Sequence, residues 1–338
     1  MKKVLVAMGY EDDGWKSSQI HARELHKNLA SLRPDYGLEL YLPTLGRKPR
    51  FIDRRFRYGA HIGDIDVFHL VDPAYGDFLT QLSPQVKKIV TVTDCAFWLN
   101  RTFINSPIRK LIVNGVKAAD CVIAISEKTR RELKDVLGVE ANRVIYLGVD
   151  EQVFKLSQVH RNPKQILHIG SNQPRKRIDR IIRLLKFLPD DFLFHQIGTH
   201  FNSEQVKMIK DFGLENRVSQ IETGSLSQII EAYQSCGVFV FPSDYEGYGM
   251  PCIESRLTGA SLVVSNDMPA LESLPNDGGF LGVDFRLFDS LKAHPDKDKV
   301  VNWIIENSGK QIPLENRESY SWLRAAKEVD EIYRGYLG

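Results

Sequence analysis

The chain has 338 residues, of which 43% are hydrophobic and 26% charged, as in a globular protein with two domains of ordinary size. Its formal net charge of +2 gives no general argument for binding nucleic acid. No apolar run approaches the roughly 18 residues of a membrane helix, and the N-terminus lacks a signal-like segment, so we expect a cytoplasmic protein. Cys95, Cys121, Cys236 and Cys252 form no C-x-x-C pair and are predicted to be buried thiols, outside any disulfide or zinc site.

Short apolar runs alternate with amphipathic stretches in the first half of the chain. We predict helices at residues 17–32 and 127–138. This alternation is typical of parallel strands joined by helical crossovers. The strands are predicted at residues 3–8, 38–42, 66–71, 88–94, 121–126 and 143–148.

The same pattern restarts after a polar stretch near residues 150–163, where we place the junction between two domains. A helix at residues 177–188 and a long amphipathic helix in the tail, residues 318–337, accompany the second set of strands. The prediction is an α/β protein with two doubly wound, Rossmann-like domains, whose ligand binds at the carboxyl ends of the strands. The second set of strands is predicted at residues 165–170, 192–198, 218–222, 237–243 and 260–266.

The segment SDYEGYGMPCIES, residues 243–255, places two carboxylates around glycines at a strand-to-helix crossing. Gly247 and Gly249 allow close approach to the backbone, and a helix beginning near Pro251 offers its positive end to an anion. Glu254 can accept hydrogen bonds from a vicinal diol such as a ribose, and Glu246 from a sugar hydroxyl. Either acid alone is better explained as a turn cap or a solvated helix residue, but the whole segment favours a ligand site.

A basic cluster follows the strand predicted at residues 165–170. It delivers Arg175, Lys176 and Arg177 to the start of a helix, where cations oppose the helix dipole. A diphosphate between them would remove the conflict, because arginine binds phosphate in a bidentate manner and lysine acts as a point charge. For isolated arginines a solvated basic turn is the better explanation. The usual phosphate loops, G-x-G-x-x-G after the first strand and G-x-x-x-x-G-K-[ST], are absent from the sequence.

Five passages of the chain, in order, resemble those of the retaining, group 1 type of nucleotide-sugar glycosyltransferases. One of them is similar to the family's E-G-F-G-x-P-x-x-E segment. The resemblance implies the GT-B architecture, with an acceptor-side domain at residues 1–155 and a nucleotide-sugar domain at residues 156–315 facing it across a cleft. A C-terminal helix, residues 316–338, would pack back on the first domain. The passages are ADCVIAISEKTRREL, VIYLGVDEQVF, ILHIGSNQPRKRIDRII, FPSDYEGYGMPCIESRLTGASLVVSN and ESYSWLRAAKEVDEIY.

The resemblance also implies roles for individual residues. Glu254 would bind the ribose of the donor, and Glu246 would contact the transferred sugar. Lys176, helped by Arg175, would neutralise the leaving diphosphate. Base recognition would fall at residues 223–227. Further donor contacts are implied for Gly170, Ser171, Gly247, Tyr248, Gly249, Ser225 and Leu226.

Several positions depart from the family pattern. Thr93 stands beside Asp94 where the family often has a histidine, and its hydroxyl would replace only part of a donor contact. Asp94 is a candidate general base. Ser171 stands where an arginine is common, and Arg175 would supply that charge. Gly14 is a candidate for the family's glycine loop near the acceptor and phosphate, although a plain turn explains it equally well.

The activity implied is transfer of a hexose, with retention, from a nucleotide diphosphate sugar to a glycan, lipid-linked or small-molecule acceptor, without a metal or other cofactor. In such enzymes the leaving phosphate is thought to help deprotonate the acceptor, so the two glutamates are not a hydrolase pair. Two alternatives stay open: a nucleotide-sugar epimerase of the same fold, and a catalytically weak subunit that binds a partner transferase. Thr93 is the main support for the weak subunit.

Three other features need an interpretation. The basic and aromatic segment at Arg47–Arg57 is either a solvated loop or a patch for an anionic membrane surface, which would make the protein peripheral on the inner face. Asp64 and Asp66 spell D-x-D, but they immediately precede a strand and are interpreted as a turn and strand entry, without a metal. His69 is expected to be a satisfied core or rim histidine.

Overall fold

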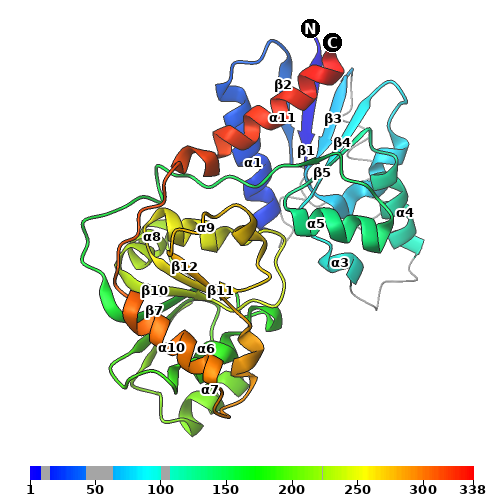
Figure 1. Ribbon diagram of the computed structural model, residues 1–338. Helices are drawn as coiled ribbons and strands as arrows, with labels where there is room; N and C mark the ends of the chain where they lie inside the picture. The colour runs from blue at the N-terminus through cyan, green and yellow to red at the C-terminus, as the bar shows by residue number, and fades with distance from the viewer. Residues whose placement is uncertain (9–15, 43–63, 100–106, 223) are drawn as a thin grey trace. The chain divides into compact units, whose positions relative to one another are not determined.

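The computed structural model describes residues 1–8, 16–42, 64–99, 107–222 and 224–338. The chain divides into two compact units (Figure 1): unit 1 comprises residues 1–148 and 318–338, and unit 2 comprises residues 149–317. Each unit holds a six-stranded parallel sheet with helices packed against it, which confirms the predicted α/β class. The boundary placed at residue 155 falls a few residues later than this division. No helix in the described part of the chain is long and apolar enough to cross a membrane.

The sheet of unit 1 has the strand order β2-β1-β3-β4-β5-β6. Its central strands are apolar runs whose residues are almost all buried, as expected for parallel strands covered on both faces. Its strands are β1 (Lys3–Ala7), β2 (Gly37–Tyr41), β3 (Val67–Leu70), β4 (Lys87–Val92), β5 (Cys121–Ala124) and β6 (Arg143–Val144).

The last helix of the chain, α11 (Trp322–Leu337), belongs to unit 1 and packs beside α1 (Lys16–Ser31) and against β3 (Figure 1). His69 on β3 lies inside this packing. Its Nδ1 is 2.6 Å from the hydroxyl of Tyr333, and its Nε2 is 2.8 Å from the hydroxyl of Thr91, so it is a satisfied core histidine, as predicted. The other helices of the unit are α3 (Ala96–Leu99), α4 (Pro107–Lys117) and α5 (Glu127–Glu132), with a π-helical turn at Leu133–Leu137 and a 3₁₀ segment at Pro73–Gln81.

Two smaller expectations concern Asp66 and the cysteines. The Asp66 carboxylate accepts hydrogen bonds from the backbone N–H of Lys3 at 2.9 Å and the ammonium of Lys2 at 3.0 Å, so it fixes the entry to the neighbouring strands. All four cysteines are buried free thiols, which confirms their interpretation.

The sheet of unit 2 has the order β12-β11-β10-β7-β8-β9. Five of its strands were predicted, and β12 was not, because its four residues include Gly282 and are only partly buried. The strands are β7 (Asn162–Gly170), β8 (Leu193–Gly198), β9 (Val218–Ile221), β10 (Cys236–Phe241), β11 (Ser261–Ser265) and β12 (Phe280–Val283).

The helices of unit 2 complete its core. The helix predicted at residues 177–188 is present as α6 (Ile178–Leu185). Its apolar residues at helical spacing are buried, namely Ile178, Ile181, Ile182 and Leu185, and Leu188 beyond its end is buried with them. Apolar residues at helical spacing thus identified the face that packs on the sheet. The remaining helices are α7 (Ser203–Asp211), α8 (Leu226–Ser235), α9 (Met250–Leu257) and α10 (Pro295–Asn307).

Candidate functional site

The two motifs that the sequence analysis singled out meet at one edge of the unit 2 sheet. β7 ends at Gly170 and leads to a 3₁₀ turn at Pro174–Lys176, while the adjacent strand β10 ends at Phe241. Because neighbouring parallel strands end at the same edge, the loops that follow them lie together. The backbone N–H of Asp244 donates to the carbonyl of Arg175 at 2.8 Å, which ties the two loops to each other.

Three donors converge on the Glu246 carboxylate. The Lys176 ammonium lies 2.6 Å from Glu246 Oε1, the Ser243 hydroxyl 2.6 Å and the Arg175 guanidinium 2.8 Å. The side chains of Lys176 and Glu246 are only 10% and 11% exposed, so this is a buried ion pair. The ammonium also lies 4.9 Å from the centre of the Phe241 ring, a cation–π distance.

The charges in this cluster determine its protonation. Burial by itself would raise the pKa of Glu246, but the cations Lys176 and Arg175 outweigh it and hold the pKa below the ordinary value. Burial lowers the pKa of Lys176, and the Glu246 carboxylate offsets part of that effect. With the glutamate ionised between two cations, the cluster carries one positive charge in excess, and it can accept an anion.

The helix that follows this cluster begins at a glycine, as its position requires. Gly249 has a φ of 98° at the N-cap of α9, and a Cβ there would lie 2.8 Å from the sulfur of Met268. Pro251 lies in the first turn, as predicted. The Tyr248 side chain is buried, with its hydroxyl 2.9 Å from that of Ser273, so this side chain belongs to the core.

Glu254 lies one turn into α9 and is half-buried. Its Oε2 accepts a hydrogen bond of 2.9 Å from the hydroxyl of Tyr233 on α8. Burial raises the pKa of the Glu254 carboxyl to about 7, although the tyrosine hydrogen bond opposes this rise. Glu254 therefore changes its charge near neutral pH.

Arg177 belongs to a different cluster from Lys176. Its guanidinium pairs with Asp179 at 3.1 Å, Asp244 at 2.9 Å and Asp289 at 2.7 Å. The buried Arg180 also pairs with Asp244 and with Asp289. The chain's own carboxylates thus balance the cation at the start of α6, and the anion that we expected beside Arg177 is not needed there.

The other predicted donor contacts have clear places in unit 2. Gly170 and Ser171 end β7 and begin the loop that carries Lys176. Ser225 caps α8, because its hydroxyl accepts from the Gln228 N–H at 3.3 Å, and the side chain of Leu226 is 57% exposed in the first turn.

Four further candidates belong to unit 1 or lie outside the described residues. Thr93 and Asp94 follow β4, and Asp94 Oδ1 accepts a 2.8 Å hydrogen bond from the Ala96 N–H at the start of α3. Gly14 and the basic segment Arg47–Arg57 lie outside the described residues.

Sequence reasoning missed the two neutral partners of the glutamates. Ser243 stands in the quoted segment three positions before Glu246, and this short spacing after a strand end could have indicated a turn that brings them together. Tyr233 left no such signal, because only the packing of α8 against α9 brings it to Glu254.

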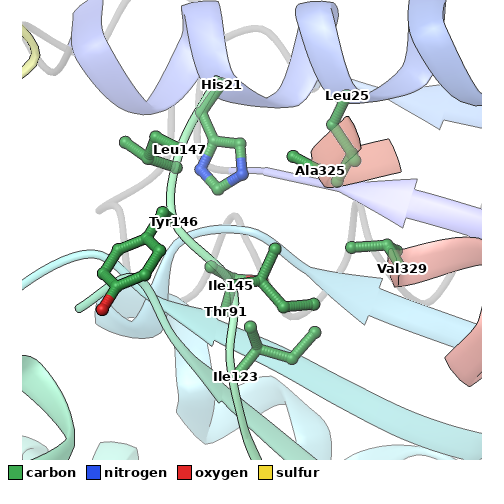
Figure 2. A pocket seen from close by; sticks show the side chains of 9 residues that line it. All are labelled: His21, Leu25, Thr91, Ile123, Ile145, Tyr146, Leu147, Ala325 and Val329. Carbon is green, nitrogen blue, oxygen red and sulfur yellow. The ribbon is translucent and has the colours of Figure 1, made fainter. Parts of the chain in front are cut away.

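In the part of the chain that the structure describes, two cavities have neither glutamate in their lining. One, of about 270 Å³, opens at the ends of β10, β11 and β12 and is lined by Arg180, Ser243 and Asp244 among others. The other lies in unit 1, and Figure 2 shows the His21 imidazole pointing into it among apolar side chains. The volume of this cavity, about 10 Å³, suits one water molecule at most. Burial lowers the pKa of His21 to about 3, so the histidine is neutral.

Comparison with known proteins agrees with the geometry. Residues 150–286 match the family model described as "Glycosyl transferases group 1", and residues 13–153 match "Glycosyltransferase Family 4". The serotype-specific mannosyltransferase WbdA from Escherichia coli is 27% identical over 193 residues, which take in 51% of this chain. The match spans 23% of the length of WbdA.

Solved structures share the fold over nearly the whole chain. Sucrose-phosphate synthase from Thermosynechococcus elongatus matches with a TM-score of 0.74 and 17% identity, covering 100% of this chain and 99% of that one. HepE from Anabaena, in complex with UDP and glucose, matches with a TM-score of 0.70 and 16% identity, covering 99% and 100%. Taken with the family models, these likenesses lead to one assignment: the chain belongs to the group 1 glycosyltransferase family, with a GT-B fold.

Proposed function

We propose that the protein transfers a hexose from a nucleotide diphosphate sugar to a hydroxyl of a glycan acceptor, with retention at the anomeric carbon. The observation that carries this proposal is the convergence of Lys176 and Arg175 on Glu246 beside the glycine-capped start of α9. Cations, a carboxylate and a glycine-capped helix N-terminus at one strand edge suit a ligand with both phosphates and hydroxyls. HepE, the structural neighbour solved with UDP and glucose, supports the same ligand class.

The cations act on the diphosphate. As the bond between the sugar and the phosphate oxygen breaks, negative charge builds up on the leaving group. Lys176 and Arg175 are held in place by Glu246 and the backbone before any ligand arrives, so they need little reorganisation to stabilise that charge. Gly249 lets the phosphates approach the N-terminus of α9, whose dipole favours an anion.

The two glutamates take different parts of the donor. Glu254 accepts hydrogen bonds from the ribose hydroxyls through its oxygen that faces away from Tyr233, and so it orients the nucleotide. Glu246 exchanges its contact with the cations for a hydroxyl of the transferred sugar. Because sugar and diphosphate thus engage adjoining groups, the anomeric carbon is fixed relative to the leaving oxygen.

The reaction balances without a nucleophile from the chain. The acceptor oxygen forms its bond to the anomeric carbon on the face from which the diphosphate departs. The proton of that acceptor hydroxyl passes to the departing phosphate oxygen, and the electrons of the broken bond stay on the diphosphate. The products are the extended glycan and the nucleoside diphosphate.

Thermal unfolding with added nucleotide sugars tests the donor assignment. GDP-mannose is tested first, because the relative WbdA is a mannosyltransferase, and UDP-glucose, UDP-galactose and ADP-glucose follow. A donor at a hundredfold excess over its dissociation constant stabilises the fold by about 2.7 kcal/mol. We expect one donor to raise the melting temperature of the wild type and of Glu231→Gln, an exposed control on α8, but not of Glu254→Gln.

Transfer itself is measured next, by incubating the stabilising donor with mannose-containing oligosaccharides and determining the anomeric configuration of the product by NMR. Product with the donor's configuration supports the proposal, and inverted product contradicts retention. Interconversion of the donor without any acceptor would instead identify an epimerase. No stabilisation by any donor would contradict the nucleotide-sugar assignment.

A further inference from the structure

The side chain of Tyr233 is completely buried and is held on two sides by aromatic rings. The ring of Phe154 lies 5.9 Å from it and the ring of Phe239 lies 5.2 Å from it, both steeply tilted to its plane. From this position its hydroxyl donates to Oε2 of Glu254 at 2.9 Å. A buried tyrosine hydroxyl needs a partner, and here that partner is the glutamate to which ribose binding is assigned.

The backbone of Tyr233 is fixed as well. Its carbonyl accepts hydrogen bonds from the Arg161 guanidinium at 2.9 Å and from the Thr258 hydroxyl at 3.3 Å. Arg161 also donates to the carbonyls of Cys236 and Thr258, the C-caps of α8 and α9. Since one buried guanidinium joins both helix ends, the tyrosine on α8 and the glutamate on α9 keep a fixed separation.

Apart from the Tyr233 hydroxyl, few groups around Glu254 stabilise its ionised carboxylate. Among the residues that the structure describes, Glu254 forms no ion pair, and Tyr233 is its hydrogen-bond partner. The titratable groups that face it are Tyr233 from α8 and the neutral thiol of Cys252 on its own helix, with Cys236 behind the tyrosine. Glu246 raises the pKa of the Cys252 thiol and Lys176 lowers it, so the effects of these two charges oppose each other. The tyrosine hydroxyl is therefore the main local group that favours the carboxylate.

We propose that Tyr233 is a positioning residue that orients the Glu254 carboxylate and sets the pH range in which the protein binds its nucleotide. This inference rests on the proposed function, because it takes Glu254 as the ribose ligand. Tyr233 occupies Oε2 and so leaves Oε1 to the ligand. It also stabilises the ionised form, which accepts hydroxyl donors at each oxygen, over the neutral acid.

The first experiment needs no ligand. In protein labelled with ¹³C at the glutamate carboxyls, the resonance of Glu254 is identified by its loss in Glu254→Gln, and its titration midpoint is followed by NMR. We expect a midpoint near pH 7 in the wild type, in agreement with its pKa of about 7, and a higher one in Tyr233→Phe. Tyr333→Phe is the matched control, because it removes another buried tyrosine hydroxyl, in unit 1, and it should leave the midpoint unchanged.

The second experiment measures the dissociation constant of the stabilising nucleotide sugar from pH 6 to pH 9. Each unit by which the midpoint rises weakens binding by roughly tenfold at pH values below both midpoints, and the loss disappears at high pH. A loss in Tyr233→Phe that is the same at every pH would assign the tyrosine a merely structural role and overturn the proposal. An unchanged carboxyl midpoint would overturn it as well.

The two readouts separate this inference from the proposed function. One outcome is that the Glu254 titration midpoint rises in ligand-free Tyr233→Phe while the wild type binds no nucleotide. This outcome would refute the nucleotide function, and with it the claim that Tyr233 controls nucleotide binding. Wild-type binding with equal pH profiles in both proteins would refute the tyrosine assignment alone.

Discussion

Replacing Lys176 by methionine is expected to leave Glu246 as a buried carboxylate without its main partner. Removing one member of a buried ion pair costs about 3–5 kcal/mol in other proteins. Here the Arg175 guanidinium at 2.8 Å and the Ser243 hydroxyl at 2.6 Å remain on the same oxygen. We therefore expect the free energy of unfolding to fall by about 2–3 kcal/mol, below or at the lower end of that range. With a urea slope near 2 kcal/mol per molar, the unfolding midpoint falls by roughly 1 M.

The pH dependence of this loss identifies its cause. In the wild type the lowered pKa of Glu246 gives stability that is present above the unfolded pKa and is lost as the pH falls through the folded value. Without Lys176 the pKa of Glu246 in the folded state rises, so Glu246 becomes protonated in the variant as the pH falls. A neutral Glu246 no longer needs a cation. The loss of unfolding free energy relative to the wild type is therefore smaller at pH 5 than at pH 7.5. Urea unfolding of the full chain, followed by circular dichroism at both pH values, measures the difference. The double variant Lys176→Met/Glu246→Gln should regain stability relative to Lys176→Met. Equal deficits at both pH values, or no regain, would refute the reasoning.

Three more predictions concern the neighbouring residues. Glu254→Gln should weaken nucleotide-sugar binding and remove the pH dependence of that binding. In the wild type the affinity should rise about tenfold from pH 6 to pH 8, because the Glu254 carboxyl, with a pKa of about 7, ionises over this range. Titration calorimetry of both proteins at several pH values measures these affinities. Glu246→Gln should not weaken the binding of nucleoside diphosphate, because it removes the carboxylate that the diphosphate would displace. It should lower the transfer rate by roughly 100-fold, because the sugar loses its positioning contact; unchanged turnover would contradict this role. Gly249→Ala should lower the free energy of unfolding by about 1–3 kcal/mol, because φ at this position is 98° and a Cβ would lie 2.8 Å from the Met268 sulfur. A urea unfolding midpoint equal to that of the wild type would contradict this prediction.

The sequence predicted those features that depend on local pattern. The buried stripe of α6 follows from apolar spacing, and the start of α9 follows from a glycine and a proline placed after an apolar strand. β12 escaped prediction because its run is short and interrupted by Gly282. The meeting of Lys176 with Glu246 was accessible only in part: a resemblance placed both in one site, but their direct ion pair depends on the adjacency of β7 and β10.

Features that depend on tertiary packing were beyond the reach of sequence reasoning. Arg177 adjoins Lys176 in the chain, and nothing in their spacing tells that one faces Glu246 while the other faces three aspartates. The left-handed conformation of Arg177 separates their directions. Tyr233 is likewise an ordinary buried position on an amphipathic helix until α9 is placed beside it.

In the proposed function, the buried pair of Lys176 and Glu246 would make donor binding an exchange of anions. Without ligand the glutamate substitutes for the phosphate, so the cations keep their places and the unit stays stable when empty. An arriving diphosphate would displace the carboxylate, which would then need new hydrogen-bond donors. A sugar attached to the diphosphate would supply them through its hydroxyls, and a bare nucleoside diphosphate would not. The intact donor should therefore bind more tightly than the product that remains after transfer, which favours product release.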